Sequence, residues 1–234
     1  MDREQIAGNL RRVHERIAVA ASKVGRRSAE ITLIGVSKTQ PAEAIRAAFE
    51  GGLRNFGENR VQEWEGKRAA LGDLQATWHL VGHLQSNKAA RAAGLFHSVD
   101  SVDDFAVAQR LDRARDGQSD SRELRVLLEV RVEEEESKNG VRVEDAGALA
   151  EKVMTLSHLE LRGLMCIPPF LEDAEKVRRY FRRLRELRDS LAREIGRELP
   201  VLSMGMSHDF EVAIEEGATE VRVGTAIFGI RTPK

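Results

Sequence analysis

The sequence predicts one closed (β/α)8 barrel, an α/β fold of the TIM-barrel class, with an extra helix at its N-terminus. Three observations carry this prediction: the length of 234 residues, eight short β-type runs, and helical stretches that alternate with those runs along the chain. A barrel of this class commonly takes about 250 residues as one domain. We therefore expect residues 1–234 to form a single domain, although an open parallel sheet is the alternative.

The extra helix is the first element along the chain. Acidic residues and arginines are spread through the first 25 residues, which excludes the apolar block of a secretory leader. The apolar residues recur at helical spacing instead: Ile6, Leu10, Val13, Ile17 and Val24. This spacing indicates an amphipathic helix whose apolar face packs on the barrel.

The eight runs that follow are rich in β-branched and apolar residues, as strands are. They cover residues 31–37, 53–58, 77–82, 95–100, 124–130, 159–165, 199–205 and 219–224. Residues 41–51 form the first helical stretch between them, opened by Pro41 and followed by two glycines. Residues 173–195 form another, with an apolar stripe at Val177, Phe181, Leu184, Leu187 and Leu191.

Charged residues make up 32% of the chain but give a formal net charge of only −1, so no global field favours nucleic acid or an anionic membrane. The arginine-rich stretch 176–194 mixes acids with its arginines off the apolar stripe, which favours a solvated helix face over a nucleic-acid surface. The acidic loop 133–140 and the polar loop 115–122 are likewise interpreted as solvated surface.

The expected cellular location of the protein depends on its apolar runs and its cysteines. No apolar run approaches the roughly 20 residues of a membrane span. Cys166 is the single cysteine, so it forms no internal disulfide and no cysteine-rich metal site. These features predict a cytoplasmic protein that binds neither membrane nor metal.

Functional groups of such barrels gather where strands end and the following loops begin. Lys38 directly follows the first predicted strand, where desolvation lowers an amine pKa and permits imine formation with an aldehyde. Ser207 is predicted to cap a helix that runs to about Glu216, and Gly224 with Thr225 forms a small turn after the last strand. The loops after strands 7 and 8 often hold phosphate in barrels.

A lysine beside a phosphate site indicates a Schiff-base aldolase or a protein that binds pyridoxal 5′-phosphate (PLP). Lys88 is the rival for the imine, but it lies in a predicted helix several residues past its strand, where surface exposure is expected. The residues alone leave the choice between aldolase and PLP protein open.

Six segments resemble the pyridoxal phosphate homeostasis protein family in the same order along nearly the whole chain. They are GVSKTQP (35–41), NFGENRVQE (55–63), WHLVGHLQSNK (78–88), GLMCIPP (163–169), LSMGMSHDFEVAI (202–214) and VRVGTAIFG (221–229). The resemblance implies a barrel of the alanine racemase N-terminal type. It also implies that Lys38 bears PLP as a Schiff base and that Asn59 and Met165 face the cofactor. By the same resemblance, Ser207, Gly224 and Thr225 contact phosphate, and Arg222 faces the pyridine nitrogen.

Arg222 shapes the expected function. A guanidinium stays protonated and only donates hydrogen bonds, so it disfavours protonation of the pyridine ring and weakens the electron sink of PLP chemistry. Alanine racemases resemble this chain in carrying that arginine but add a C-terminal β domain, which this sequence lacks. We therefore expect a PLP carrier with no catalytic residues, monomeric, which buffers PLP or supplies it to PLP-dependent apoenzymes. A weak PLP-dependent racemase or transaminase is the alternative.

Overall fold

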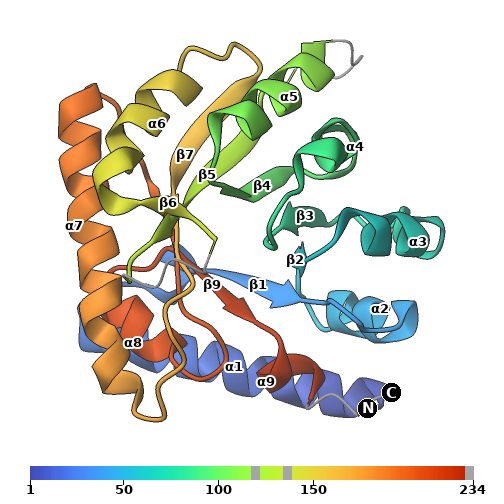
Figure 1. Cartoon of the computed structure of the whole chain (residues 1–234). Coiled ribbons are helices and arrows are strands. Elements are labelled where there is room, and N and C mark those ends of the chain that lie inside the picture. The colour runs from blue at the N-terminus through green and yellow to red at the C-terminus, as the bar shows by residue number, and fades with distance from the viewer. Residues whose placement is uncertain (117–121, 134–138, 230–234) are drawn as a thin grey trace.

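Eight parallel strands close into a barrel that is surrounded by helices (Figure 1). The computed structural model describes residues 1–116, 122–133 and 139–229. The barrel strands are β1 (Thr32–Val36), β2 (Asn55–Glu58), β3 (Thr77–Leu80), β4 (Ser98–Val102), β5 (Leu124–Arg131), β7 (Leu159–Met165), β8 (Val201–Ser203) and β9 (Glu220–Val223). They pair in this order, and β9 pairs with β1, which closes the barrel and confirms the predicted fold class.

The helices cover the outside of the barrel and connect its strands (Figure 1). They are α1 (Arg3–Lys23), α2 (Ala42–Glu50), α3 (Val61–Leu71), α4 (Ala89–Leu95), α5 (Phe105–Asp116), α6 (Ala146–Val153), α7 (Arg178–Ile195), α8 (Phe210–Glu215) and α9 (Thr225–Phe228). Four short 3-10 turns accompany them: η1 (Ser28–Glu30), η2 (Ser86–Lys88), η3 (Val143–Asp145) and η4 (Ala174–Val177). This arrangement places the βα loops at one end of the barrel.

Each of the eight predicted runs overlaps one of the barrel strands. The run at 95–100 was placed too early, because α4 extends through Leu95 and β4 begins at Ser98. The structure also holds a strand that was not predicted, β6 (Val141–Arg142), which pairs with the end of β5. A strand of two residues is too short to show a periodic pattern in the sequence.

The N-terminal helix packs along the outside of the barrel against α2, α8 and α9 (Figure 1). Its predicted apolar face is buried, with one correction: Val24 is 42% exposed. The helix ends at Lys23, so Val24 is only its C-cap residue, and Ala20 and Ala21 complete the buried face instead. Asp2 and Gln5 form a capping box at the helix start.

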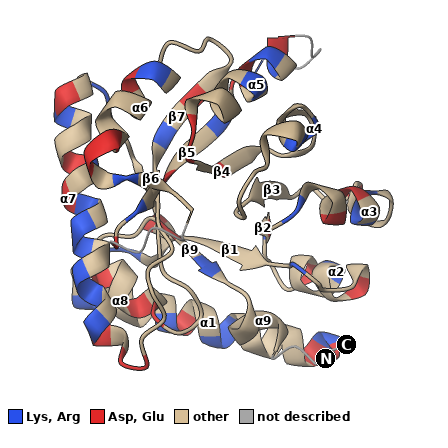
Figure 2. Cartoon of the chain, in the orientation of Figure 1, with Lys and Arg blue, Asp and Glu red and all other residues tan. Residues whose placement is uncertain are grey.

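Several arginines of α7 form ion pairs with another helix, whereas the sequence had predicted that they only face solvent. The apolar stripe is buried as expected except at Leu187, which is half-buried. Three arginines converge on Glu216 near the end of α8, with N–O distances of 3.3, 2.8 and 3.2 Å for Arg178, Arg182 and Arg185. Figure 2 shows Lys or Arg and Asp or Glu side by side along α7. These ion pairs fasten α7 to α8, so the charge run is partly structural.

The two polar loops of the sequence are described only at their edges. Residues 117–121 and 134–138 lie outside the described residues, and with them most of the acidic loop whose solvation was predicted. Within the described ranges, no helix combines the length and the apolar character that a membrane span needs.

Candidate functional site

A cavity of about 250 Å³ lies at the end of the barrel where β1, β8 and β9 give way to their loops. It brings together five residues singled out from the sequence: Lys38, Ser207, Arg222, Gly224 and Thr225. The other lining residues are Val36, Gln40, Phe170, Met206, His208 and Gly229. The cavity therefore combines an amine, a guanidinium and two small-residue turns.

Arg222 lines this cavity, is only 4% exposed and is held in one orientation by two hydrogen bonds. Its Nη1 donates to the hydroxyl of Ser203 at 2.8 Å, and its Nη2 donates to the carbonyl of Cys166 at 2.8 Å. These two bonds use two of the five N–H donors of a guanidinium. The orientation of the charge is fixed, and donors remain for a group in the cavity.

Ser207 does not cap α8, which corrects the prediction. The helix α8 begins at Phe210 with Asp209 as its N-cap, and Asp209 accepts from the backbone N–H of Met206 at 2.6 Å. Ser207 Oγ instead accepts from the N–H groups of Gly224 and Ala226, at 3.2 and 3.3 Å. The hydroxyl thus joins the two turns that the sequence assigned to phosphate binding.

The backbone before Lys38 is fastened by a network that sequence reasoning missed. Lys67 donates to the carbonyl of Ser37 at 2.9 Å, to Glu58 at 2.9 Å and to Glu63 at 2.7 Å. Ser37 Oγ donates to Glu58 at 2.7 Å, and the N–H after Lys38 also donates to Glu63. The four-residue spacing of Glu63 and Lys67 within one helix was the available signal.

The pKa values of the two carboxyl groups of this network are shifted in opposite directions. Burial raises the pKa of Glu58, and the attraction of Lys67 offsets this only in part. Burial also acts to raise the pKa of Glu63, but hydrogen bonds from Lys67 and from the Thr39 N–H lower it overall. Lys67 therefore stabilises the charged form of Glu63, and at Glu58 it offsets part of the free-energy cost of burying a carboxylate.

Two of the seven predicted residues do not line the cavity around Lys38. Asn59 follows β2 and lines a second cavity near the ends of β2 and β3. Met165 is completely buried in the barrel interior, where it packs with Leu127 and Val201. A role of either residue in contacting a cofactor stays a prediction.

Two buried titratable groups near Arg222 were also missed. Burial, with a contribution from Asp103, raises the pKa of Glu129 to about 7, while Arg222 acts to lower it. Burial raises the pKa of Cys166 to about 12, so its thiol stays protonated and is no nucleophile. Glu129 lies in the middle of an apolar run, which gave no sign that its side chain faces the barrel interior.

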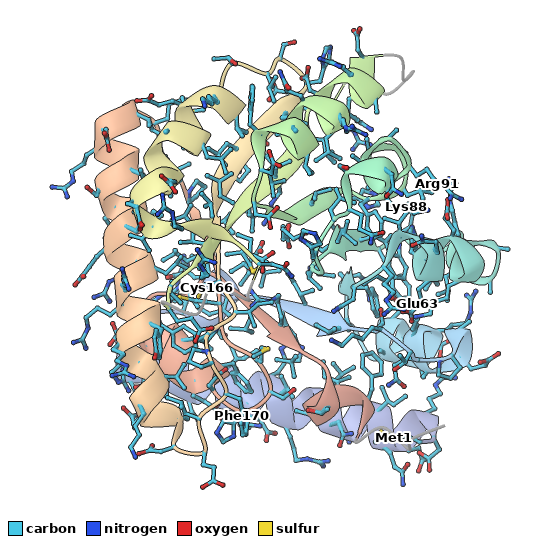
Figure 3. The ribbon with its side chains drawn as sticks, in the orientation of Figure 1. Met1, Glu63, Lys88, Arg91, Cys166 and Phe170 are labelled. Carbon is cyan, nitrogen blue, oxygen red and sulfur yellow. The ribbon has the colours of Figure 1, made fainter. Side chains whose placement is uncertain are left out.

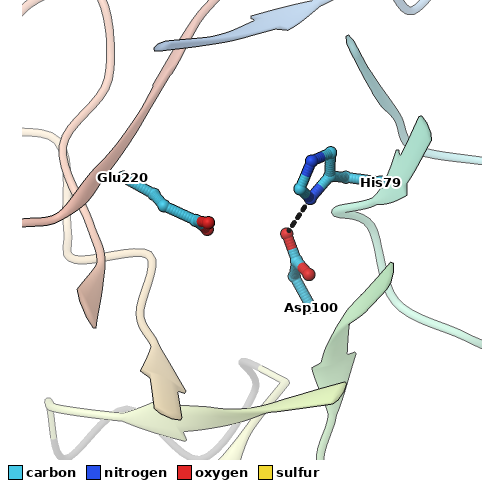
Figure 4. Close-up of side chains that lie close together, drawn as sticks. All are labelled: His79, Asp100 and Glu220. Carbon is cyan, nitrogen blue, oxygen red and sulfur yellow. Dashed lines mark hydrogen bonds and ion pairs between the residues drawn. The ribbon is translucent and has the colours of Figure 1, made fainter. Parts of the chain in front are cut away.

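A second polar cluster fills the barrel interior at the N-terminal ends of the strands. His79 Nδ1 lies 3.1 Å from a carboxylate oxygen of Asp100, and Glu220 points toward this pair (Figure 4). Arg125 donates to Glu220 from the far side of the barrel. The cluster therefore brings two carboxylates and two basic side chains together inside the barrel.

The cavity around Lys38 fits a small phosphorylated aldehyde. The N–H groups of Gly224 and Ala226 both donate to Ser207 Oγ, and the hydroxyl keeps its own proton to donate to a phosphate. Lys38 supplies the amine that an aldehyde requires. Arg222 adds a guanidinium whose orientation is fixed by Ser203 and Cys166.

Comparisons with known proteins agree with this chemistry. Residues 2–232 match the family model described as alanine racemase, N-terminal domain. A pyridoxal phosphate homeostasis protein of Aquifex aeolicus is 48% identical over 95% of this chain and 96% of its own length. One of Pseudomonas aeruginosa is 48% identical over 97% of this chain and 96% of its length. The solved structure of PipY of Synechococcus elongatus PCC7942 with PLP bound is 40% identical, with a TM-score of 0.81, over 93% of this chain and all of that one.

Proposed function

This chain belongs to the pyridoxal phosphate homeostasis protein family, and from that premise we propose that it binds PLP in the cavity around Lys38 and buffers or supplies it. The observation that carries the proposal is the meeting of Lys38, Arg222 and the Ser207 turn around one cavity. The cofactor is bound in the solved relative PipY.

Each of these residues has a separate task in the proposal. Lys38 holds the aldehyde as a Schiff base, Ser207 and Thr225 contribute hydroxyl donors to the phosphate, and Gly224 contributes a backbone N–H. Asn59 and Met165 are proposed to face the cofactor, although neither lines this cavity. Bound PLP supplies a reactive aldehyde conjugated to a ring that can accept electrons.

Arg222 supports a carrier without robust catalysis. Its guanidinium keeps one orientation through Ser203 and Cys166, and it cannot give up a proton at ordinary pH. A ring nitrogen facing it stays unprotonated, so the ring withdraws electrons weakly. Among the described residues that line the cavity, none is a carboxylic acid that could move a proton.

A weak PLP-dependent racemase or transaminase is the second candidate, favoured by the family model for alanine racemase. Incubation with amino acids and chiral analysis of the products separates it from the carrier. A PLP-free aldolase loses support because a 40% identical relative holds PLP. The recipients are proposed to be PLP-dependent apoenzymes, and the protein is proposed to act as a single-domain cytoplasmic monomer.

Covalent attachment is the decisive test of the proposal. The purified protein should absorb in the visible, and reduction with borohydride followed by peptide mapping should place the phosphopyridoxyl group on Lys38. A Lys38→Ala variant is the control and should carry no label. A label on Lys88 or Lys138 in the wild type would contradict the assignment.

A further inference from the structure

The segments GENRVQE (57–63) and HLQSNK (83–88) meet around a cavity other than the one around Lys38. This second cavity has a volume of about 530 Å³, and neither segment lines the first. It is lined by Asn59, Arg60, Val61, Gln62, Leu80, Gly82, His83, Leu84, Gln85 and Lys88. Figure 3 shows Lys88 near α3 and α4, well apart from Phe170 at the first cavity.

The floor of the second cavity is built by close contact between the two segments. A Cβ on Gly82 would lie 2.5 Å from the backbone oxygen of Asn59 and 2.7 Å from its Cα. The N–H of Val81 donates to the carbonyl of Glu58 at 2.9 Å, which continues the pairing of β2 and β3 to this point. Only glycine fits at position 82, so the segments are held in a fixed relation.

The lining is cationic. Arg60 and Lys88 contribute full positive charges, and none of the lining residues is an aspartate or glutamate. Of the carboxylates nearby, Glu65 pairs with Arg91 at 2.7 Å. Asp103 pairs with His83 of the lining at 3.4 Å and so places one negative charge beside the lining. Lys88, which the sequence predicted to be exposed, is half-buried.

The remaining lining groups are hydrogen-bond donors that suit an oxyanion. Asn59, Gln62 and Gln85 present side-chain amides. Val61 and Gln62 begin the 11-residue helix α3, whose N-cap residue Arg60 makes no side-chain cap bond. The first backbone N–H groups of that helix therefore add partial positive charge to the two cations.

We propose that this second cavity binds the phosphate monoester of a small metabolite. Two full cations and a helix start match the roughly −2 charge of a phosphate monoester near neutral pH better than the single charge of a carboxylate. Arg60 offers a planar fork to two oxygens, and Lys88 offers a point charge to the third. This site is additional to the PLP site and does not depend on the carrier function.

Inorganic phosphate is the probe for the test. It is titrated calorimetrically into the protein loaded with PLP at low ionic strength, with visible absorbance recorded to show that the first cavity stays filled. We expect one saturable site that binds phosphate at least tenfold more tightly than acetate. Arg60→Gln and Lys88→Met should each weaken phosphate binding about tenfold or more, because each removes a charge-assisted bond.

The matched control is Arg11→Gln, which removes an exposed positive charge from α1 far from both segments. It should change phosphate binding less than twofold, and unchanged thermal midpoints should show that all three variants fold. Equal binding by the control and the two cavity variants would overturn the proposal. So would the lack of a saturable site, equal binding of acetate, or loss of the bound PLP signal during the titration.

Discussion

Replacement of Lys67 by methionine should be among the most damaging single changes close to Lys38. The Lys67 side chain is 13% exposed, and its ammonium contacts Glu58 at 2.9 Å and Glu63 at 2.7 Å. The Glu58 side chain is completely buried. Lys67→Met therefore leaves a buried carboxylate without its cation and releases the Ser37 carbonyl that precedes Lys38.

The expected loss follows from the burial of the pair. Removing one partner of a buried ion pair costs about 3–5 kcal/mol, and we expect about 2–4 kcal/mol because Glu58 keeps the hydroxyl bond from Ser37. Urea denaturation measures this as a lower midpoint at unchanged slope. Lys23→Met is the control and should cost less than about 1 kcal/mol, because it removes a largely exposed cation and Glu215 keeps its ion pair with Arg178.

The loss should also depend on pH with a defined sign. Burial raises the pKa of Glu58, and removal of Lys67 raises it further. When a carboxyl has a raised pKa in the native state, the protein loses stability as pH rises from the unfolded-state pKa of that carboxyl to its native pKa. The deficit of Lys67→Met should thus shrink as pH falls through that range, and Glu58→Gln added to it should restore stability. A pH-independent deficit below about 1 kcal/mol, or no rescue, would refute the reasoning.

Three further changes test the site. Ser207→Ala with Thr225→Val should weaken retention of PLP about tenfold or more and retention of unphosphorylated pyridoxal far less; equal weakening in a dialysis assay would argue against a phosphate role. Arg222→Glu should raise deuterium incorporation into alanine, once absorbance confirms that PLP is bound; an unchanged rate would remove the explanation for weak catalysis. Because the pKa of Glu129 is raised from 4.5 to about 7, the unfolding free energy of the wild type should fall by about 2–3 kcal/mol as pH rises between these two values. Glu129→Gln should abolish this fall; parallel stability–pH curves would count against the raised pKa.

The fold was predictable because each strand carries its own local signal. Strands of a parallel barrel are short apolar runs, and the helices between them show a 3.6-residue period. The end of α4 and the start of β4 were confused because Leu95 and Phe96 suit either element. The signal fails where an element is very short, as at β6.

The site was predictable from the residues themselves where they follow a strand end closely. Lys38 follows β1, Gly224 and Thr225 follow β9, and all three line the cavity. Arg222 lies inside β9, and only the resemblance assigned it a role. The capping role of Ser207 was wrong because Asp209, two residues later, competes for the same position and takes the Met206 N–H. Met165 faces the barrel interior at a depth that a sequence cannot reveal, packed with Leu127 and Val201.

The packing of α1 against the last elements of the chain has a consequence for synthesis on the ribosome. Asn9 donates to the carbonyl of Ile227 at 2.8 Å across 218 residues of sequence, and Arg16 pairs with Glu211 at 2.5 Å. Contacts this distant in sequence form late. Until α8 and α9 have been synthesised, part of the apolar face of α1 has no permanent partner, and the nascent chain is then open to chaperones and to aggregation.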